Sequence, residues 1–156
     1  MQDLKKNFTH YKLHTQYSIC EGAIKIEDLE KFLKNNKINC VGISDTSNLC
    51  GALQFSETVS KSKIHPIIGT QIKFKYKGLI GLIPLIAKTE VGYKNIVKLS
   101  SNSYLKHKDF HEPFCELKDL AENKEGIIIT LGSINSLVGN FFKKDHLSKL
   151  KIFISF

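Results

Sequence analysis

Short apolar runs alternate with amphipathic helical segments along most of this chain, and this alternation constrains the fold more than any other feature. Residues 40–44 and 126–131 are apolar runs bounded by polar residues, which is typical of buried strands, and residues 40–44 fit a parallel one. In residues 26–35 apolar side chains recur at helical spacing, and acidic residues lie near the start, where they favour the helix dipole. The order of segments therefore predicts an α/β fold with a largely parallel sheet.

The same patterns assign an element to most other segments. Residues 79–87 read as an apolar strand, in which Pro84 disfavours a central position in the sheet. Residues 151–156 begin like a further strand, so we expect a single domain over residues 1–156 that is cut off partway through its fold. The predicted strands cover residues 8–15, 40–44, 66–74, 79–87 and 126–131, and the predicted helices cover residues 26–35, 51–62, 89–105, 115–123, 133–142 and 145–150.

Composition places the chain among ordinary globular proteins. Of its 156 residues 42% are hydrophobic and 24% are charged, and no run of about 18 apolar residues predicts a membrane helix. The polar first residues do not resemble a secretory signal, so we expect a cytoplasmic protein with no membrane partner. The cysteines fit no zinc spacing, and we expect reduced thiols at Cys20, Cys40, Cys50 and Cys115.

The formal charge of +8 leaves two interpretations open. All 23 basic residues are lysines, and they are scattered along the chain. A basic balance favours polyanion partners such as nucleic acid, whereas specific readout of bases usually employs arginine. The surface is therefore either generally basic and solvated or carries a patch that faces DNA.

Polar side chains lie within or directly after three of the predicted strands. In residues 8–15 alternation places His10, Lys12 and His14 on one face, and histidines spaced in this way are plausible metal ligands. Asp45 and Thr46 follow the strand of residues 40–44, and Gln71 follows Ile67-Ile-Gly69. Loops after parallel strands share one face of the sheet, so these side chains predict a pocket there.

These motifs resemble a known family. The runs 8–23, 42–51, 66–69 and 87–95 are similar, in this order, to the polymerase-and-histidinol-phosphatase (PHP) domain, and more narrowly to the PHP domain that opens the alpha subunits of bacterial replicative polymerases. The resemblance covers residues 8 to 139. It implies a distorted (β/α)7 barrel, here incomplete, with a trinuclear metal cleft at the carboxyl ends of its strands.

The resemblance also shows that ligands are replaced. The metal-binding pattern opens with His-x-His, where this chain has Lys12 before His14, and its Asp-His is here Asp45-Thr46. An acidic ligand of the third strand corresponds to Gln71, and further ligands correspond to Leu82 and Ser133. Neutral and cationic side chains do not replace carboxylates and imidazoles around several divalent ions. We therefore expect no metal and no catalytic residue, and a vestigial pocket of His10, Lys12, His14, Asp45, Thr46 and Gln71.

Two hypotheses concern residues in this pocket or in the motif beside it. The Lys12 ammonium would neutralise Asp45 in place of a metal ion. Tyr17 and Ser18, which match the family motif, would order the first loop.

The resemblance implies a structural module in DNA replication. Its partners would be the other domains of a polymerase subunit, the proofreading exonuclease subunit, and DNA through the parent protein. Nucleotide transfer would use magnesium elsewhere in that parent, and this part of the chain would need no cofactor. The alternative is a metal-dependent phosphoesterase or 3′–5′ exonuclease with an altered ligand set.

Overall fold

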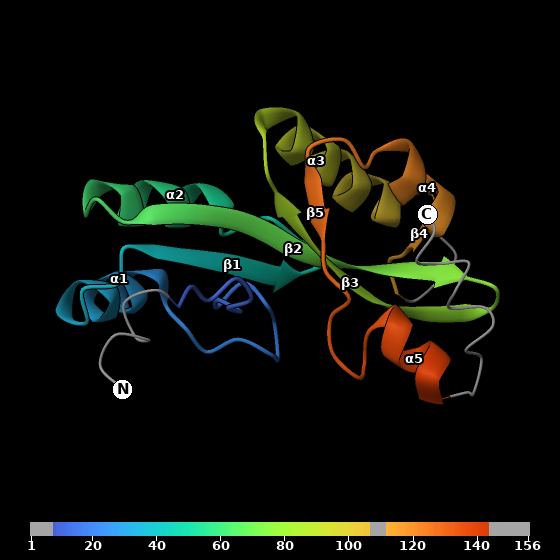
Figure 1. Cartoon of the computed structure of the whole chain (residues 1–156), viewed down its shortest axis with the longest axis horizontal. Helices are drawn as coiled ribbons and strands as arrows, with labels where there is room; N and C mark the ends of the chain where they lie inside the picture. Colours follow the sequence, from blue (N-terminus) through green and yellow to red (C-terminus); the bar gives the residue numbers. More distant parts are fainter. Residues whose placement is uncertain (1–7, 107–111, 144–156) are drawn as a thin grey trace. The chain divides into compact units, whose positions relative to one another are not determined.

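A computed structural model describes residues 8–106 and 112–143 (Figure 1). The chain divides into two compact units, Met1–Thr70 and Gln71–Phe156. Strands and helices alternate in both, which confirms the predicted α/β class. The elements are α1 (Ile26–Asn35), β1 (Cys40–Thr46), α2 (Ala52–Lys61), β2 (His65–Tyr76), β3 (Leu79–Ala87), α3 (Glu90–Leu105), β4 (Cys115–Glu116), α4 (Leu117–Glu122), β5 (Ile127–Ile129) and α5 (Leu137–Lys143).

The first unit is built around β1, which lies beside β2. Helices α1 and α2 contribute apolar side chains to one core with this strand. Burial of apolar area supplies most of the stabilisation of such a core, at about 25 cal/mol per Å². Its buried members are Ile26, Leu29 and Leu33 of α1, Val41 and Ile43 of β1, Phe55 and Val59 of α2, and Ile64.

The segment before α1 is not the regular strand that alternation predicts. Leu13 forms an isolated parallel bridge with Ile43, and Thr15 forms another with Ile24. The segment thus changes its partner from β1 to the residues before α1 within two positions. A ladder needs consecutive pairs with one neighbour, so these residues stay irregular although they lie beside β1.

In the second unit β2 and β3 form a hairpin that the sequence pattern did not identify. Only Lys77 and Gly78 connect them, and both have positive φ angles, 47° and 79°. A two-residue connection joins antiparallel strands, and turns with two positive φ angles match the twist of a hairpin. The usual signal is Asn-Gly or Asp-Gly, which explains why Lys-Gly was missed.

The sheet of the second unit mixes parallel and antiparallel pairs. β4 pairs parallel with β2, and β5 pairs antiparallel with β3. β3 lies between β2 and β5, a central position that Pro84 disfavours. The β5 pairing begins only at Leu85, and the Pro84 carbonyl accepts a hydrogen bond from the Thr130 N–H (3.1 Å), so the proline lies at the end of this ladder.

Helix boundaries differ from the predicted ones by a few residues. The segment predicted as a helix from residue 115 begins as β4 and becomes α4 only at Leu117. Helix α3 starts after Thr89, whose hydroxyl accepts the Gly92 N–H (3.1 Å) and caps the first turn. The predicted helix 145–150 and strand 151–156 lie outside the described residues. In the described part of the chain no helix has the length and apolarity needed to cross a membrane.

Candidate functional site

Asp45 near the end of β1 is the centre of a buried polar network in the first unit. Its side chain is 1% exposed. Oδ1 accepts the Thr15 backbone N–H and the Ser18 hydroxyl, each at 2.7 Å, and Oδ2 accepts the Thr15 hydroxyl at 2.7 Å. Such short hydrogen bonds to a carboxylate are charge-assisted and roughly twice as strong as neutral ones.

Thr15 and Ser18, which donate to Asp45, belong to a loop whose two ends are joined by hydrogen bonds. The Gln16 N–H donates to the Ile24 carbonyl (2.9 Å), and the Gly22 N–H donates to the Ser18 carbonyl (2.8 Å). A Cβ at Gly22 would lie 2.0 Å from the Thr15 carbonyl oxygen, so only glycine allows this approach. Residues 15–22 are hereafter the first loop.

A second loop, directly after β1, is joined to the first. The Thr46 N–H donates to Ser18 Oγ (3.1 Å), and the Thr46 hydroxyl donates to Glu21 Oε2. Asn48 donates through Nδ2 to the carbonyl oxygens of Tyr17 and Thr46, each at 3.0 Å. Side-chain hydrogen bonds therefore satisfy backbone groups of both loops where no ladder is available.

Thr70 on β2 completes the network. Its fully buried hydroxyl donates to the carbonyl oxygen of Asp45 (2.6 Å), and the carbonyl oxygen of Asn48 lies 3.0 Å from the same hydroxyl. Together these contacts tie three segments that are far apart in the sequence. We call this set the Asp45 clasp; its members are Thr15, Ser18, Asp45, Asn48 and Thr70.

Tyr17 connects the first loop to both helices of the first unit. Its hydroxyl donates to Gln54 Oε1 of α2 (2.9 Å), and Gln54 Nε2 donates to Glu27 Oε1 of α1 (3.0 Å). Tyr17 and Ser18 thus both make hydrogen bonds that order the first loop, as the motif led us to expect.

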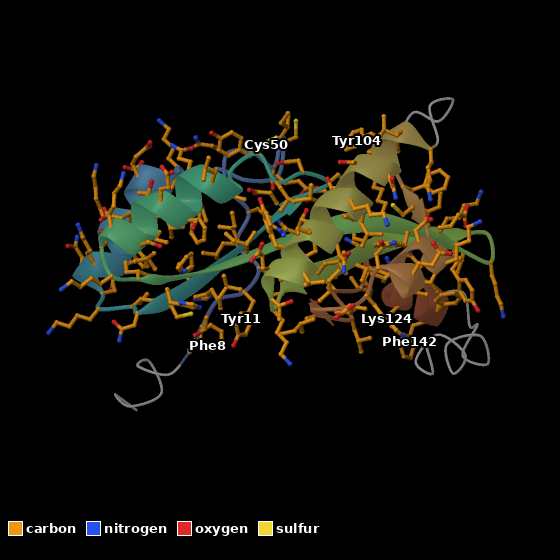
Figure 2. The ribbon with its side chains drawn as sticks, turned by 90° about the horizontal axis from the view of Figure 1, so that it is seen from above. Phe8, Tyr11, Cys50, Tyr104, Lys124 and Phe142 are labelled. Atoms are coloured by element: carbon orange, nitrogen blue, oxygen red, sulfur yellow. The ribbon has the colours of Figure 1, made fainter. Side chains whose placement is uncertain are left out.

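The other residues of the predicted pocket lie in different surroundings. His14 is half-buried, and its Nδ1 is buried without a hydrogen-bond partner, as is Oγ of Ser44. His10 and Lys12 are exposed, and the His10 ring contacts Phe8 edge-to-face (4.6 Å between centroids). Phe8 itself lies at the outer edge of the first unit (Figure 2). Gln71 is buried and belongs to the second unit.

Lys12 does not neutralise Asp45 in this structure. Among residues 8–106 and 112–143 no ion pair joins the two side chains, and Lys12 is exposed. The prediction placed Lys12 beside Asp45 because Lys12 stands at a ligand position of the metal-binding pattern that the chain resembles. Thr15 and Ser18 donate to the carboxylate instead, through two hydroxyls and one backbone amide. Sequence reasoning missed Thr15, and it also missed Thr70, whose hydroxyl donates to the backbone carbonyl of Asp45.

The second unit contains another polar cluster, at the start of α4. Asp119, 2% exposed, accepts from Lys106 Nζ (2.6 Å) and from the Glu116 N–H (3.0 Å). The hydrogen bond to Asp119 raises the pKa of Lys106. Burial raises the pKa of the nearby Cys115 thiol to about 12, and this thiol donates to the Leu99 carbonyl (3.2 Å). A thiol held neutral in this way is inert, so the cluster is structural.

Comparison with known proteins decides the family. The model of the PHP domain matches residues 10–155. This chain belongs to the PHP domain family.

Two curated relatives are named DNA polymerase III subunit alpha. The protein from Borreliella burgdorferi is 34% identical over 145 residues, which cover 86% of this chain. The protein from Pasteurella multocida is 31% identical over 154 residues, which cover 96% of this chain. The chain spans 13% of the length of each relative.

A solved structure supports the PHP fold. It is a protein from Bifidobacterium adolescentis whose name assigns it to the metal-dependent phosphoesterases. The TM-score is 0.50 at 14% sequence identity, over 66% of this chain and 35% of that protein. At this identity the likeness concerns the fold alone.

PHP membership implies a metal centre, and the side chains present here do not fit one. In the described ranges no three His, Cys, Asp or Glu side chains come together as a metal would require. His14 offers one buried ring nitrogen, and Asp45 already accepts three hydrogen bonds, two at Oδ1 and one at Oδ2. Thr46 is neutral, and exposed Lys12 is cationic. This donor set is too poor for a site of several divalent ions.

Proposed function

We propose that this chain is the amino-terminal PHP portion of a replicative DNA polymerase III alpha subunit, with a structural role in DNA replication. The observation that carries the proposal is the similarity to alpha subunits over 86% and 96% of this chain. Nucleotide transfer with magnesium would belong to parts of the subunit outside this chain, because the chain spans only 13% of those relatives.

We propose further that residues 1–156 form part of one PHP domain. The chain covers only 35% of the phosphoesterase-type neighbour, so further strands outside it would close the barrel. The exposed side chains of Ile128 and Ile129 on β5 support this proposal, because an apolar strand at the end of a sheet needs a cover.

The partners follow from the proposed parent protein. The chain would contact the other domains of the subunit and the proofreading exonuclease subunit, and would approach DNA through the parent in the cytoplasm. Whether its lysines face DNA stays an open prediction. Several are already paired with carboxylates, as Lys73 is with Glu112 (2.6 Å between Nζ and Oε2). A basic contact with DNA would weaken steeply with salt.

The absence of a fitting donor set supports a structural role over hydrolysis. The alternative enzyme, a metal-dependent phosphoesterase or 3′–5′ exonuclease, needs carboxylates and imidazoles that position and activate water. Of the six residues predicted for the pocket, only His14 has an available buried ring nitrogen.

The test uses the full-length protein. We expect magnesium-dependent primer extension, and we expect His14→Ala to leave it unchanged, like the matched control His10→Ala at an exposed histidine. Absence of primer extension would refute the polymerase assignment. Hydrolysis of a phosphoester or of a 3′ end that His14→Ala abolishes and His10→Ala spares would establish the alternative enzyme.

A further inference from the structure

The loops at the carboxyl end of β1 are the part of a PHP domain that metal ions would normally hold together. Here the side chains that the structure describes do not form a set of metal ligands, yet hydrogen bonds join the loops to each other. The first loop and the loop after β1 are joined through Ser18, which donates to Asp45 and accepts from the Thr46 N–H. Something other than a cation must therefore compensate the buried charge of Asp45.

Hydrogen bonds supply that compensation. A buried carboxylate is unfavourable unless it is paired or hydrogen-bonded. Asp45 receives three donors at 2.7 Å, two from Thr15 and one from Ser18. Its backbone carbonyl receives the buried hydroxyl of Thr70 at 2.6 Å. The charge is thus balanced by neutral dipoles of its own unit, which need neither a metal ion nor the Lys12 ammonium.

We propose that the Asp45 clasp, rather than a metal ion or Lys12, anchors the first loop to the end of β1. This inference specifies the structural role, and it depends on the proposed function only because it assumes that role. Asp45 is then an anchoring residue, and the order of residues 15–22 depends on its carboxylate. The first loop then reaches its final arrangement when the chain folds, and no metal ion has to bind.

Hydrogen–deuterium exchange of the full-length protein tests the proposal, because most amides of residues 15–22 are hydrogen-bonded within the loop or to Asp45. We expect Asp45→Asn to speed exchange in residues 15–22 about tenfold or more, with little change in α2 of the same unit. The amide keeps the shape of the side chain but removes its charge and turns one acceptor into a donor.

Matched variants and added metal distinguish three explanations for the order of the first loop: the Asp45 clasp, the Lys12 ammonium and a bound metal ion. Lys12→Ala should leave exchange of residues 15–22 within about twofold of the unmodified protein. A chelator, zinc or manganese should also change nothing. Slower exchange on adding metal, faster exchange with the chelator, or an effect of Lys12→Ala equal to that of Asp45→Asn would overturn the proposal. So would unchanged exchange in Asp45→Asn.

A milder variant keeps the test decisive if Asp45→Asn does not fold. Ser18→Ala removes one of the three donors and should raise exchange in residues 15–22 while α1 and α2 keep theirs. No change in Ser18→Ala would refute the clasp. These results do not depend on polymerase activity, so a failure of primer extension and a failure of the clasp are distinguishable.

Discussion

Thr15→Val removes one hydroxyl from a fully buried position without changing the shape of the side chain much. In the structure this hydroxyl donates to Asp45 Oδ2 (2.7 Å) and accepts the Tyr17 N–H (3.2 Å). A hydrogen bond to a charged group contributes about 1.5–3 kcal/mol, and a neutral one contributes about 0.5–1.5 kcal/mol. The added methyl group of valine returns about 0.8 kcal/mol of burial. We therefore expect a loss of about 1–4 kcal/mol in the free energy of unfolding.

Urea unfolding measures this loss as a lower midpoint with an unchanged slope. Thr9→Val is the matched control, since Thr9 is half-buried in the same segment and its side chain makes no hydrogen bond in the described structure. We expect the control to change stability by less than about 0.5 kcal/mol.

A double-mutant cycle attributes the loss to the clasp. In an Asp45→Asn background Thr15→Val should cost at least about 1 kcal/mol less, because the shared hydrogen bond is already weakened. Equal losses for Thr15→Val and Thr9→Val, or strict additivity with Asp45→Asn, would refute the reasoning.

Four further predictions concern other side chains. Ser44→Ala should be neutral or stabilise the chain by up to about 1 kcal/mol in urea unfolding, because the Ser44 hydroxyl is buried without a partner, and a clear loss would show that it has one. Phe55→Ala in the first-unit core should lower the free energy of unfolding by about 3–5 kcal/mol, and a loss below about 1 kcal/mol would contradict this packing. Thiol labelling of the native protein should modify exposed Cys20 and Cys50 (Cys50 is labelled in Figure 2) and spare Cys115. Because burial raises the pKa of Cys115 from 9.0 to about 12, the unfolded chain loses this proton first as pH rises. Stability should therefore fall from about pH 9 toward pH 12, and less so in Cys115→Ala.

The alternation of apolar runs and helical segments was enough to predict the class of fold and most elements. Long signals such as those of α3 and β3 are robust, because many residues share one periodicity. The hairpin at Lys77-Gly78 was missed because its turn needs a positive φ angle at both residues, and lysine rarely adopts one. Pro84 was misleading because its effect depends on where the neighbouring strand ends, which is a tertiary property.

The residues of the candidate site, too, were predictable from the sequence only in part. The motif around His14, Tyr17 and Ser18 marked the first loop as important, and Asp45 was singled out. The sequence could not show that Thr15 lies against a carboxylate thirty positions away, because that contact follows from the parallel bridge between Leu13 and Ile43. The proposed role of Lys12 came from its place in the metal-binding pattern, which does not show where the side chain points; in the part of the chain that the structure describes, Lys12 is exposed and forms no ion pair with Asp45.

Metal content tests the central claim most directly. Elemental analysis of the purified full-length protein, combined with thermal unfolding with and without a chelator, reports whether the PHP domain holds a transition metal. The account predicts zinc, manganese and iron far below one equivalent, with the same melting temperature in both conditions. A stoichiometric metal that is lost in His14→Ala, together with a melting temperature that falls on chelation, would contradict it.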